Sequence, residues 1–292
     1  MYGGVLTALV TPMRDGDVDH RALAEITEWQ IASGVDGLVP CGTTGEAATL
    51  TPKERAEVIR TVVEAARGRV PVVAGAGANS TAATIELSRA ALAAGADGLL
   101  LVCPYYNKPT PAGLEAHFEA VLAEVDVPVV LYNIPGRTGV DMGVDTFSSL
   151  AEHPRVVGIK EATGQVTRAA DLVKRLEGRA AVLAGDDPLY LPILAVGGRG
   201  IVSATACVAP RQMVSVMRAF EAGKLEEARA AFLDLLDLFT AMFLETNPGP
   251  AKAALHIMGK ISPEIRLPLV WPSQGTLDRL RATLQSGGYL EP

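Results

Sequence analysis

The sequence predicts an α/β fold, a (β/α)8 TIM barrel with a C-terminal helical appendage. One unit recurs along the chain: a short run of Val, Leu, Ile and Gly, a turn with Gly, Pro or Asn, and an amphipathic helix. Eight such runs alternate with helical segments, and no change of composition separates them. The length of 292 residues suits a barrel of roughly 250 residues with an addition. Eight parallel strands can also close without leaving exposed edges, which favours a barrel over an open sheet.

The expected strands are short and apolar, as parallel strands buried on both faces usually are. They span residues 4–10, 37–41, 70–75, 98–103, 127–133, 156–160, 181–185 and 200–204. The expected helices between them include residues 21–33, 52–67, 81–94, 111–124, 145–152 and 167–176. Thr51 and Pro52 begin one helix as N-cap and first helical residue, and Gly34, Gly95 and Gly178 follow helix ends.

The pattern changes after the eighth strand. We expect residues 1–223 to form the catalytic barrel and residues 224–292 to form a C-terminal helical region. Residues 224–254 read as one or two long helices interrupted by the motif at 247–250, and residues 276–284 read as another helix. Several apolar side chains keep helical spacing there, which predicts core packing or an oligomer seam. They are Phe232, Leu235, Leu236, Phe239, Met242 and Phe243.

Composition excludes several classes of function. The net charge is −7 and no block of Lys and Arg occurs, which argues against a nucleic-acid or acidic-membrane surface. Cys41, Cys103 and Cys207 are far apart, which suits a reducing compartment better than a disulfide framework. No basic leader precedes a long apolar run, and no stretch reaches transmembrane length. We therefore expect a soluble cytoplasmic protein.

Lys160 ends an otherwise uncharged apolar run, Val156 to Ile159. An interior lysine is rarely left without a partner, and desolvation favours its neutral amine, which can attack a carbonyl and form a Schiff base. Two structural alternatives remain open for such a residue. The side chain could reach out to solvent at the strand end, or it could pair with an acid such as Glu161.

Catalytic groups of a barrel lie at the carboxyl ends of its strands. The second strand is followed by two hydroxyls between glycines, Thr43 and Thr44, in a turn that suits a small carboxylate. An ordinary turn into the next helix explains the same residues, with Glu46 as a first-turn capping acid. Strand five ends in Tyr132 and Asn133, and Tyr132 shares parity with Val130, so it points inward if Val130 does. Its phenol could therefore face the Lys160 amine across one strand gap of roughly 5 Å and shuttle protons.

Arg137 follows strand five and offers a planar fork for a carboxylate, or else an exposed salt bridge. Tyr105 and Tyr106 stand at the expected barrel mouth, where subunit packing would explain them equally well. The four histidines lack metal-ligand spacing, which disfavours a zinc-dependent aldolase. No P-loop or dinucleotide-binding glycine motif opens a helix. The acids at 186 and 187 could resemble a metal pair, but the pattern favours a polar turn.

Together these motifs resemble the dihydrodipicolinate synthase/N-acetylneuraminate lyase superfamily. The resemblance runs along the whole chain, through GTTGEAATLTPKER, PYYNKPT, YNIPGRTG, GIKEATG, GDD and NPGPAK. YYNKP, YNIPGRTG and NPGPAK are more similar to the dihydrodipicolinate synthase branch than to the sialic acid lyase branch. The resemblance implies condensation of pyruvate with L-aspartate 4-semialdehyde in lysine and diaminopimelate biosynthesis, without a metal or organic cofactor. A sister aldolase acting on a keto-deoxy sugar acid, or a non-catalytic barrel that binds keto acids, remains the alternative.

The resemblance also implies a role for particular residues. Lys160 would form the Schiff base with pyruvate. Tyr132, Thr43 and Tyr106 would relay protons, with Tyr106 inserted from a neighbouring subunit of a homotetramer. The remaining residues would bind substrate. Thr44 would hold the pyruvate carboxylate, Arg137 would hold the carboxylate of the aldehyde, and the backbone near Gly185 and Val202 would shape the site.

One departure concerns regulation. Lysine-inhibited relatives carry basic or aromatic residues and an acid at a feedback site between subunits. Asn79 and Tyr105 match that pattern, but Pro52, Arg55 and Ala83 occupy the other corresponding positions. The α-amino group of lysine would lose its carboxylate partner at Ala83, and Arg55 adds a like charge. We therefore expect lysine inhibition to be weak or absent.

Overall fold

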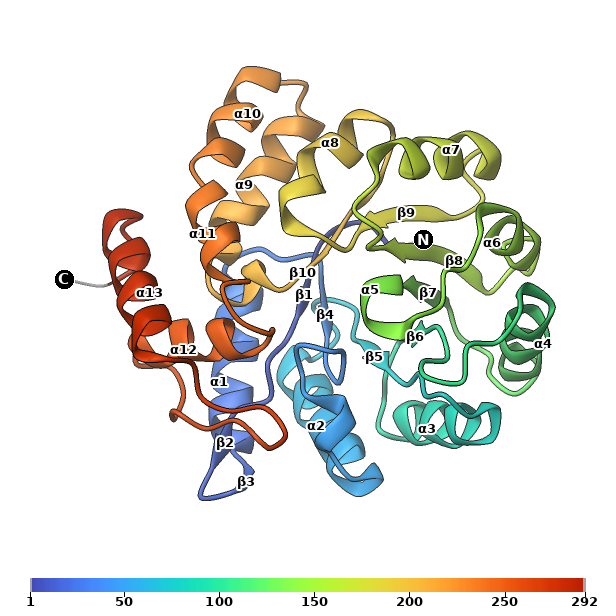
Figure 1. Ribbon diagram of the computed structural model, residues 1–292, viewed down its shortest axis with the longest axis horizontal. Helices are drawn as coiled ribbons and strands as arrows, with labels where there is room; N and C mark the ends of the chain where they lie inside the picture. The colour runs from blue at the N-terminus through green and yellow to red at the C-terminus, as the bar shows by residue number, and fades with distance from the viewer. Residues whose placement is uncertain (1, 291–292) are drawn as a thin grey trace.

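The structure, a computed structural model, describes residues 2–290. Its main sheet has eight parallel strands, with helices arranged around the outside (Figure 1). The strands are β1 (Gly4–Ala8), β4 (Gly37–Val39), β5 (Val73–Gly75), β6 (Gly98–Val102), β7 (Val129–Asn133), β8 (Val156–Glu161), β9 (Ala181–Ala184) and β10 (Gly200–Ser203). Their order is β4-β1-β10-β9-β8-β7-β6-β5, so strands consecutive in the sheet follow the order of the chain around a circle.

The two ends of this sheet meet, which makes it a barrel. Leu38 of β4 forms a parallel bridge with Val72, next to β5. The Leu38 backbone N–H also donates to the Pro71 carbonyl oxygen at 3.0 Å. All eight predicted strands are therefore present, and the predicted closed barrel is confirmed. The third strand begins later than the predicted 70–75 because Pro71 has no N–H to donate to a ladder.

Nine helices precede the C-terminal region in residues 2–223 of the structure, and six of them match the predicted spans to within two residues at each end. They are α1 (His20–Ala32), α2 (Pro52–Ala66), α3 (Thr81–Ala93), α4 (Pro111–Leu122), α5 (Pro135–Thr138), α6 (Val144–Leu150), α7 (Val166–Leu176), α8 (Tyr190–Ala195) and α9 (Pro210–Glu221). The predicted start of α2 is confirmed as a capping box, in which Thr51 and Glu54 bond reciprocally. A short hairpin of β2 (Met13–Arg14) and β3 (Asp17–Val18) lies outside the barrel.

The barrel separates two apolar cores. The inner core fills the space enclosed by the strands, and it includes Leu6, Val39, Val130, Leu183 and Val202. A larger outer core lies between the strands and the helices. This division follows from the strand period of two, because successive side chains point to opposite faces of the sheet. Polar residues at inward positions are therefore directed into the barrel mouth or its interior.

The prediction of one or two long helices over residues 224–254 is wrong. Three short helices occur there instead, α10 (Leu225–Leu233), α11 (Leu236–Ala241) and α12 (Gly249–Ile257). Across the turn between α10 and α11, the centroids of the Phe232 and Phe239 rings lie 5.5 Å apart. The motif at 247–250 interrupts the helices as predicted, yet Gly249 and Pro250 already belong to α12, because proline is accepted in a first turn.

Most of the apolar residues expected in a core or seam are in the core. Phe232, Leu235, Phe239 and Met242 are buried, whereas Leu236 and Phe243 remain exposed. The predicted final helix is confirmed as α13 (Gln274–Ser286). Among residues 2–290, no helix combines the length and apolar character needed to cross a membrane.

The loop between α12 and α13 is attached to the barrel by Arg266. Its guanidinium donates to Glu54 at 2.5 Å, to the Thr49 carbonyl at 3.1 Å and to the Gly16 carbonyl at 3.0 Å. The hydrogen bond from Arg266 is the largest cause that lowers the pKa of Glu54 to about 2. A carboxyl whose pKa is lower in the folded state favours folding above its unfolded pKa of about 4.5, and this contribution is lost as the pH falls toward 2.

We therefore expect Glu54→Gln to lower the thermal midpoint at neutral pH and to lose its effect near pH 2. Midpoints of both proteins measured across the acid range give the comparison. Glu57→Gln, a change at a more exposed acid of the same helix, is the matched control. A constant difference between Glu54→Gln and the parent protein at all pH values would contradict this account.

Candidate active site

Lys160 and Tyr132 face one another near the carboxyl ends of β8 and β7. The two residues are paired in the register of β7 and β8. The Lys160 Nζ lies 4.4 Å from the centroid of the Tyr132 ring. The residues are 7% and 5% exposed, so the amine is held against an aromatic face and largely away from water. The juxtaposition predicted from strand parity is confirmed.

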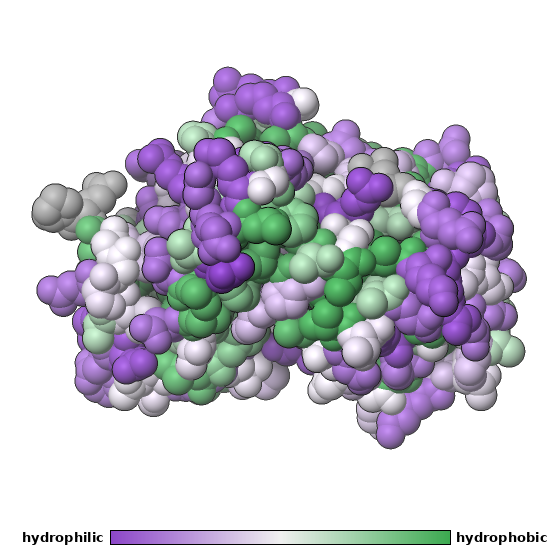
Figure 2. Space-filling view, turned by 90° about the horizontal axis from the view of Figure 1, so that it is seen from above, coloured by the Kyte–Doolittle hydropathy of each residue, from purple (hydrophilic) through white to green (hydrophobic). Residues whose placement is uncertain are grey.

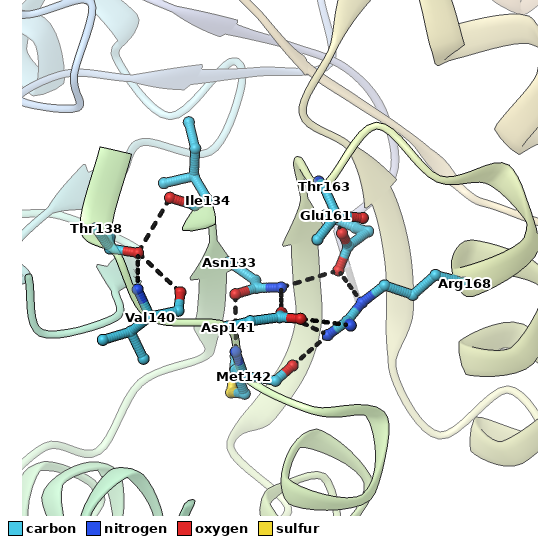
Figure 3. A network of polar contacts seen from close by, with 9 residues as sticks. All are labelled: Asn133, Ile134, Thr138, Val140, Asp141, Met142, Glu161, Thr163 and Arg168. Atoms are coloured by element: carbon cyan, nitrogen blue, oxygen red, sulfur yellow. Dashed lines mark hydrogen bonds and ion pairs between the residues drawn. The ribbon is translucent and has the colours of Figure 1, made fainter. Parts of the chain in front are cut away.

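Glu161 is not the partner of Lys160. Its carboxylate projects to the opposite face of β8, where it accepts from Arg168 Nε at 3.2 Å and from the Thr163 N–H at 2.9 Å (Figure 3). In the part of the chain that the structure describes, no ion pair or hydrogen bond joins the Lys160 side chain to another residue. Burial also excludes the alternative of a side chain that reaches out to solvent. Lys160 thus has the position that a reacting amine requires.

Two acids, Asp186 and Asp187, follow β9 and lie within the electrostatic influence of the Lys160 charge. Asp187 is buried, and its carboxylate accepts from Ser203 Oγ, from Thr205 Oγ1 at 2.8 Å and from the Thr205 N–H at 3.2 Å. Burial raises the pKa of Asp187, while these hydrogen bonds and the charge of Lys160 oppose the rise. Burial also raises the pKa of Asp186, and Lys160 again opposes it. Hydroxyl and backbone groups thus satisfy Asp187, which agrees with a polar turn.

No group of three or more His, Cys, Asp or Glu side chains suited to a metal ion occurs within residues 2–290. Cys41, Cys103 and Cys207 are unpaired and buried. Burial raises the pKa of each thiol to about 12, which leaves these groups protonated and unreactive. They behave as small core residues.

The turn after β4 places two threonines in different environments. The Glu46 N–H donates to the Thr43 carbonyl at 3.1 Å, which closes the turn. A Cβ on Gly45 would lie 2.9 Å from the Cys41 nitrogen, so only glycine fits at this position. Thr44 is buried, and its Oγ1 accepts from Asn247 Nδ2 at 3.0 Å. Because that bond uses an oxygen lone pair, the Thr44 hydroxyl hydrogen remains able to donate to a ligand.

A cavity of about 350 Å³ opens beside these groups. Thr43, Tyr132 and Arg137 line it, together with Asn247 from the C-terminal region. Arg137 lies in the short helix α5, and its Nη2 donates to the Asn247 carbonyl at 3.4 Å. The cavity therefore joins a hydroxyl turn, a phenol and a guanidinium, which can orient a small acid. Lys160 and Thr44 do not line it, and the Lys160 amine is connected to it through the Tyr132 ring.

Gly185 and Val202 lie outside the lining of this cavity. The Gly185 N–H donates to the Glu161 carbonyl at 2.8 Å, and a Cβ on Gly185 would be 2.6 Å from that of Ala162. A larger residue at 185 would therefore push apart the strand ends that support Lys160. Val202 is buried in the inner core with Tyr132. Both residues shape the site by packing, and neither lines the cavity itself.

Tyr106 is not brought to the site by its own chain. Its side chain is 88% exposed and does not line the cavity, whereas the neighbouring Tyr105 does. The backbone of Tyr106 has φ +75°, a left-handed conformation that costs a non-glycine residue roughly 1–3 kcal/mol. Its N–H donates to the Thr138 carbonyl at 3.3 Å, in the segment that carries Arg137. The loop thus presents this phenol outward from the edge of the active-site cavity.

A model of the dihydrodipicolinate synthetase family matches residues 1–286. The chain belongs to this family.

Relatives agree with the family over their full lengths. A 4-hydroxy-tetrahydrodipicolinate synthase of Anaeromyxobacter sp. (strain Fw109-5) is 52% identical over 286 residues, which cover 98% of this chain and 97% of the relative. The dihydrodipicolinate synthase structure from Aquifex aeolicus superposes with a TM-score of 0.97 at 42% identity, with 100% of each chain covered. The Acinetobacter baumannii enzyme complexed with pyruvate superposes with a TM-score of 0.97 at 43% identity, covering 99% of this chain and 100% of that one.

One buried ion pair of this family member was not expected from the sequence. The Lys252 Nζ in α12 donates to Glu46 Oε1 at 2.5 Å, and Glu46 Oε2 accepts from the Arg266 N–H at 3.0 Å. Burial lowers the pKa of Lys252, and the charge of Glu46 opposes this effect. Glu46 stands at the N-cap position of the short 3-10 helix Ala47–Thr49, but its side chain makes no capping hydrogen bond there. The pair instead holds the C-terminal region against the threonine turn.

Removing one partner of a buried ion pair leaves an uncompensated charge. We expect Lys252→Met to lower the free energy of unfolding by about 3–5 kcal/mol. The double variant Glu46→Gln/Lys252→Met removes both charges and should lose less than the single variant. Urea unfolding of the three proteins measures this difference. A double variant that is destabilised more than Lys252→Met would contradict the assignment.

Proposed function

We propose that this chain is a 4-hydroxy-tetrahydrodipicolinate synthase, a lyase that condenses pyruvate with L-aspartate 4-semialdehyde in lysine and diaminopimelate biosynthesis. The observation that carries the proposal is the buried Lys160 amine, which faces the Tyr132 phenol without a carboxylate partner recorded in residues 2–290. Membership of the dihydrodipicolinate synthetase family and the names of full-length relatives support it.

The first half-reaction uses Lys160 and pyruvate. The neutral amine attacks the ketone carbon, the carbinolamine loses its hydroxyl as water, and a protonated imine remains. This imine accepts the electron pair of a methyl C–H bond when the proton leaves, which gives the enamine. Tyr132 carries protons between the nitrogen and the leaving hydroxyl, and Thr43 passes them on toward Tyr106. The free hydroxyl hydrogen of Thr44 donates to the pyruvate carboxylate.

The second half-reaction begins with the aldehyde. The enamine carbon attacks the aldehyde carbon, a new C–C bond forms, and the aldehyde oxygen takes a proton. Arg137 binds the carboxylate of the semialdehyde from the cavity wall. The substrate amino group then attacks the imine carbon, which closes the ring and expels the Lys160 amine. Gly185 and Val202 keep the surroundings of Lys160 fixed through these steps, which require neither a metal nor an organic cofactor.

We also propose that the enzyme is a cytoplasmic homotetramer, arranged as a dimer of dimers. Tyr106 supports this arrangement, because a phenol that is exposed in one chain can complete the relay of a second copy. Figure 2 shows hydrophobic residues gathered in patches across one face of the molecule, with hydrophilic residues around them. The exposed large apolar residues of the chain include Leu225, Leu233, Leu267 and Val270. Such exposure is typical of surfaces that are covered by another subunit.

Borohydride reduction in the presence of pyruvate tests the Schiff base. We expect a stable adduct on the peptide that contains Lys160, found by mass spectrometry after digestion. Lys160→Ala should abolish both the adduct and synthase turnover, because no other amine occupies this position. Lys108→Ala, at an exposed lysine of the mouth, should still form the adduct. An adduct on another lysine, or an active Lys160→Ala protein, would overturn the proposal.

Turnover with different aldehydes distinguishes the synthase from a sister aldolase. We expect condensation of pyruvate with L-aspartate 4-semialdehyde to exceed cleavage of keto-deoxy sugar acids by orders of magnitude in kcat/KM. Arg137→Ala should raise KM for the semialdehyde while the pyruvate adduct still forms, since the guanidinium contacts only the second substrate. Preference for a keto-deoxy acid would establish the sister activity, and a pyruvate adduct without any turnover would favour a binding protein.

Lysine should inhibit the enzyme weakly or not at all. Arg55 lines the cavity beside Tyr105, and its Nε and Nη2 donate to the Ala47 carbonyl at 3.0 and 2.6 Å. This guanidinium repels an incoming ammonium group, and Ala83 supplies no carboxylate to hold it. Synthase assays with added lysine measure the effect, and Ala83→Glu should increase it by restoring an acid. Strong inhibition of the parent enzyme by sub-millimolar lysine would refute this prediction.

A further inference from the structure

A polar network lies directly behind the reacting pair, on the outer face of the same two strands (Figure 3). Asn133 and Glu161 each follow one residue after Tyr132 and Lys160, and they form the next pair in the register of β7 and β8. Both are buried. Asn133 Nδ2 donates to Glu161 Oε2 at 3.4 Å, which connects the two strand ends across the gap between them.

Arg168 of α7 is the cation at the centre of this network. Its Nε donates to Glu161 Oε2 at 3.2 Å, and its Nη1 donates to Asp141 Oδ2 at 3.1 Å. Its Nη2 donates to the Met142 carbonyl. The Arg168 side chain is only 12% exposed, so these charges interact in surroundings that water screens poorly. One guanidinium therefore joins β8, α7 and the loop that follows Arg137.

Asn133 attaches the same loop to β7. Its Nδ2 donates to Asp141 Oδ1 at 2.9 Å, and its Oδ1 accepts from the Met142 N–H at 3.0 Å. The loop between α5 and α6 is thus fixed by both Asn133 and Arg168. Since α5 carries Arg137, the network supports three groups of the proposed reaction from behind.

We propose that Arg168 is a positioning residue that keeps Glu161 paired away from Lys160 and fixes Lys160 against Tyr132. This inference rests on the proposed function and deepens it. Arg168 does not line the cavity. It acts through Glu161, Asn133 and the strand ends that carry the reacting groups.

Two physical effects make this role consequential. The first is alignment, because a displacement of about 1 Å in a reacting pair can cost 10²-fold in rate. The second is charge. Without Arg168, the buried Glu161 carboxylate would lose its guanidinium partner while an amine lies on the adjacent residue. A negative charge there favours the ammonium form of Lys160, which cannot attack a ketone.

Other titratable groups face Lys160 from the elements packed around it. They are Tyr132 on β7 and the acids Asp186 and Asp187 after β9, and they remain unchanged when Arg168 is replaced. Asp141 also loses Arg168, but its side chain is 51% exposed and its charge is screened by water, whereas Glu161 is buried. A change in pH dependence caused by Arg168 is therefore assigned to the Glu161 charge. The double variant that also removes this charge provides the test.

The experiment measures the rate at which the pyruvate adduct forms, trapped by borohydride, as a function of pH. We expect Arg168→Met to reduce this rate at least tenfold at pH 7 and to move the acid limb of the profile to higher pH. Arg168→Met/Glu161→Gln should return the limb toward the parent position, because both charges are then absent. Arg175→Met is the matched control, since this arginine of the same helix pairs with Asp171 and Asp145 on the exposed side.

A folded Arg168→Met protein with a rate within twofold of its parent and an unmoved acid limb would overturn the proposal. If that variant does not fold, Arg168→Lys decides the question, because it keeps the charge and loses the planar fork. We expect it to keep the parent acid limb and to trap pyruvate at least threefold more slowly. An unchanged rate in this variant counts against positioning. Failure of the parent protein to trap pyruvate counts against the proposed function instead.

Discussion

The register of β7 and β8 is the constraint on which the site depends. It places Tyr132 opposite Lys160 on the inner face and Asn133 opposite Glu161 on the outer face. A slip of one residue would exchange the faces, turning the amine toward the helices and the carboxylate into the barrel. In the proposed reaction the inner face carries the reacting amine, while the outer face carries a paired carboxylate. Side chains alternate between the two faces along β8, so the consecutive residues Lys160 and Glu161 take these two roles on opposite sides of the strand.

The C-terminal region completes the site from the other side of the barrel mouth. Asn247 bonds to Thr44 with its amide and to Arg137 with its carbonyl, so it connects the groups proposed to bind the two substrates. The buried pair of Glu46 and Lys252 fixes this segment in place. Residues on both sides of the boundary predicted at residue 223 therefore line one cavity.

Local patterns predicted most of the fold, because apolar strand runs, helix caps and the glycines that end helices all act within a few residues. They also predicted that Tyr132 faces Lys160, since parity and strand order determine which side chains meet. They did not predict the partner of Glu46, because Lys252 is 206 residues away and both charges read as ordinary surface groups. The short helices after residue 224 were also missed, since apolar periodicity continues through the turn at Asp234 where packing ends the helix.

Contacts between distant segments cannot be predicted from local patterns, and for this reason the sequence does not indicate a role for Arg168. It lies in an amphipathic helix at a position where an arginine commonly faces solvent, and its partners come from two other segments, β8 and the loop between α5 and α6. The sequence does show that an acid, Glu161, directly follows the proposed nucleophile. A buried carboxylate requires a cationic partner. Without Arg168, the nearest cation along the strand would be the Lys160 amine. The fold supplies the Arg168 guanidinium on the opposite face, which leaves Lys160 without a carboxylate partner. In the proposed reaction, α7 is therefore part of the framework that positions the amine.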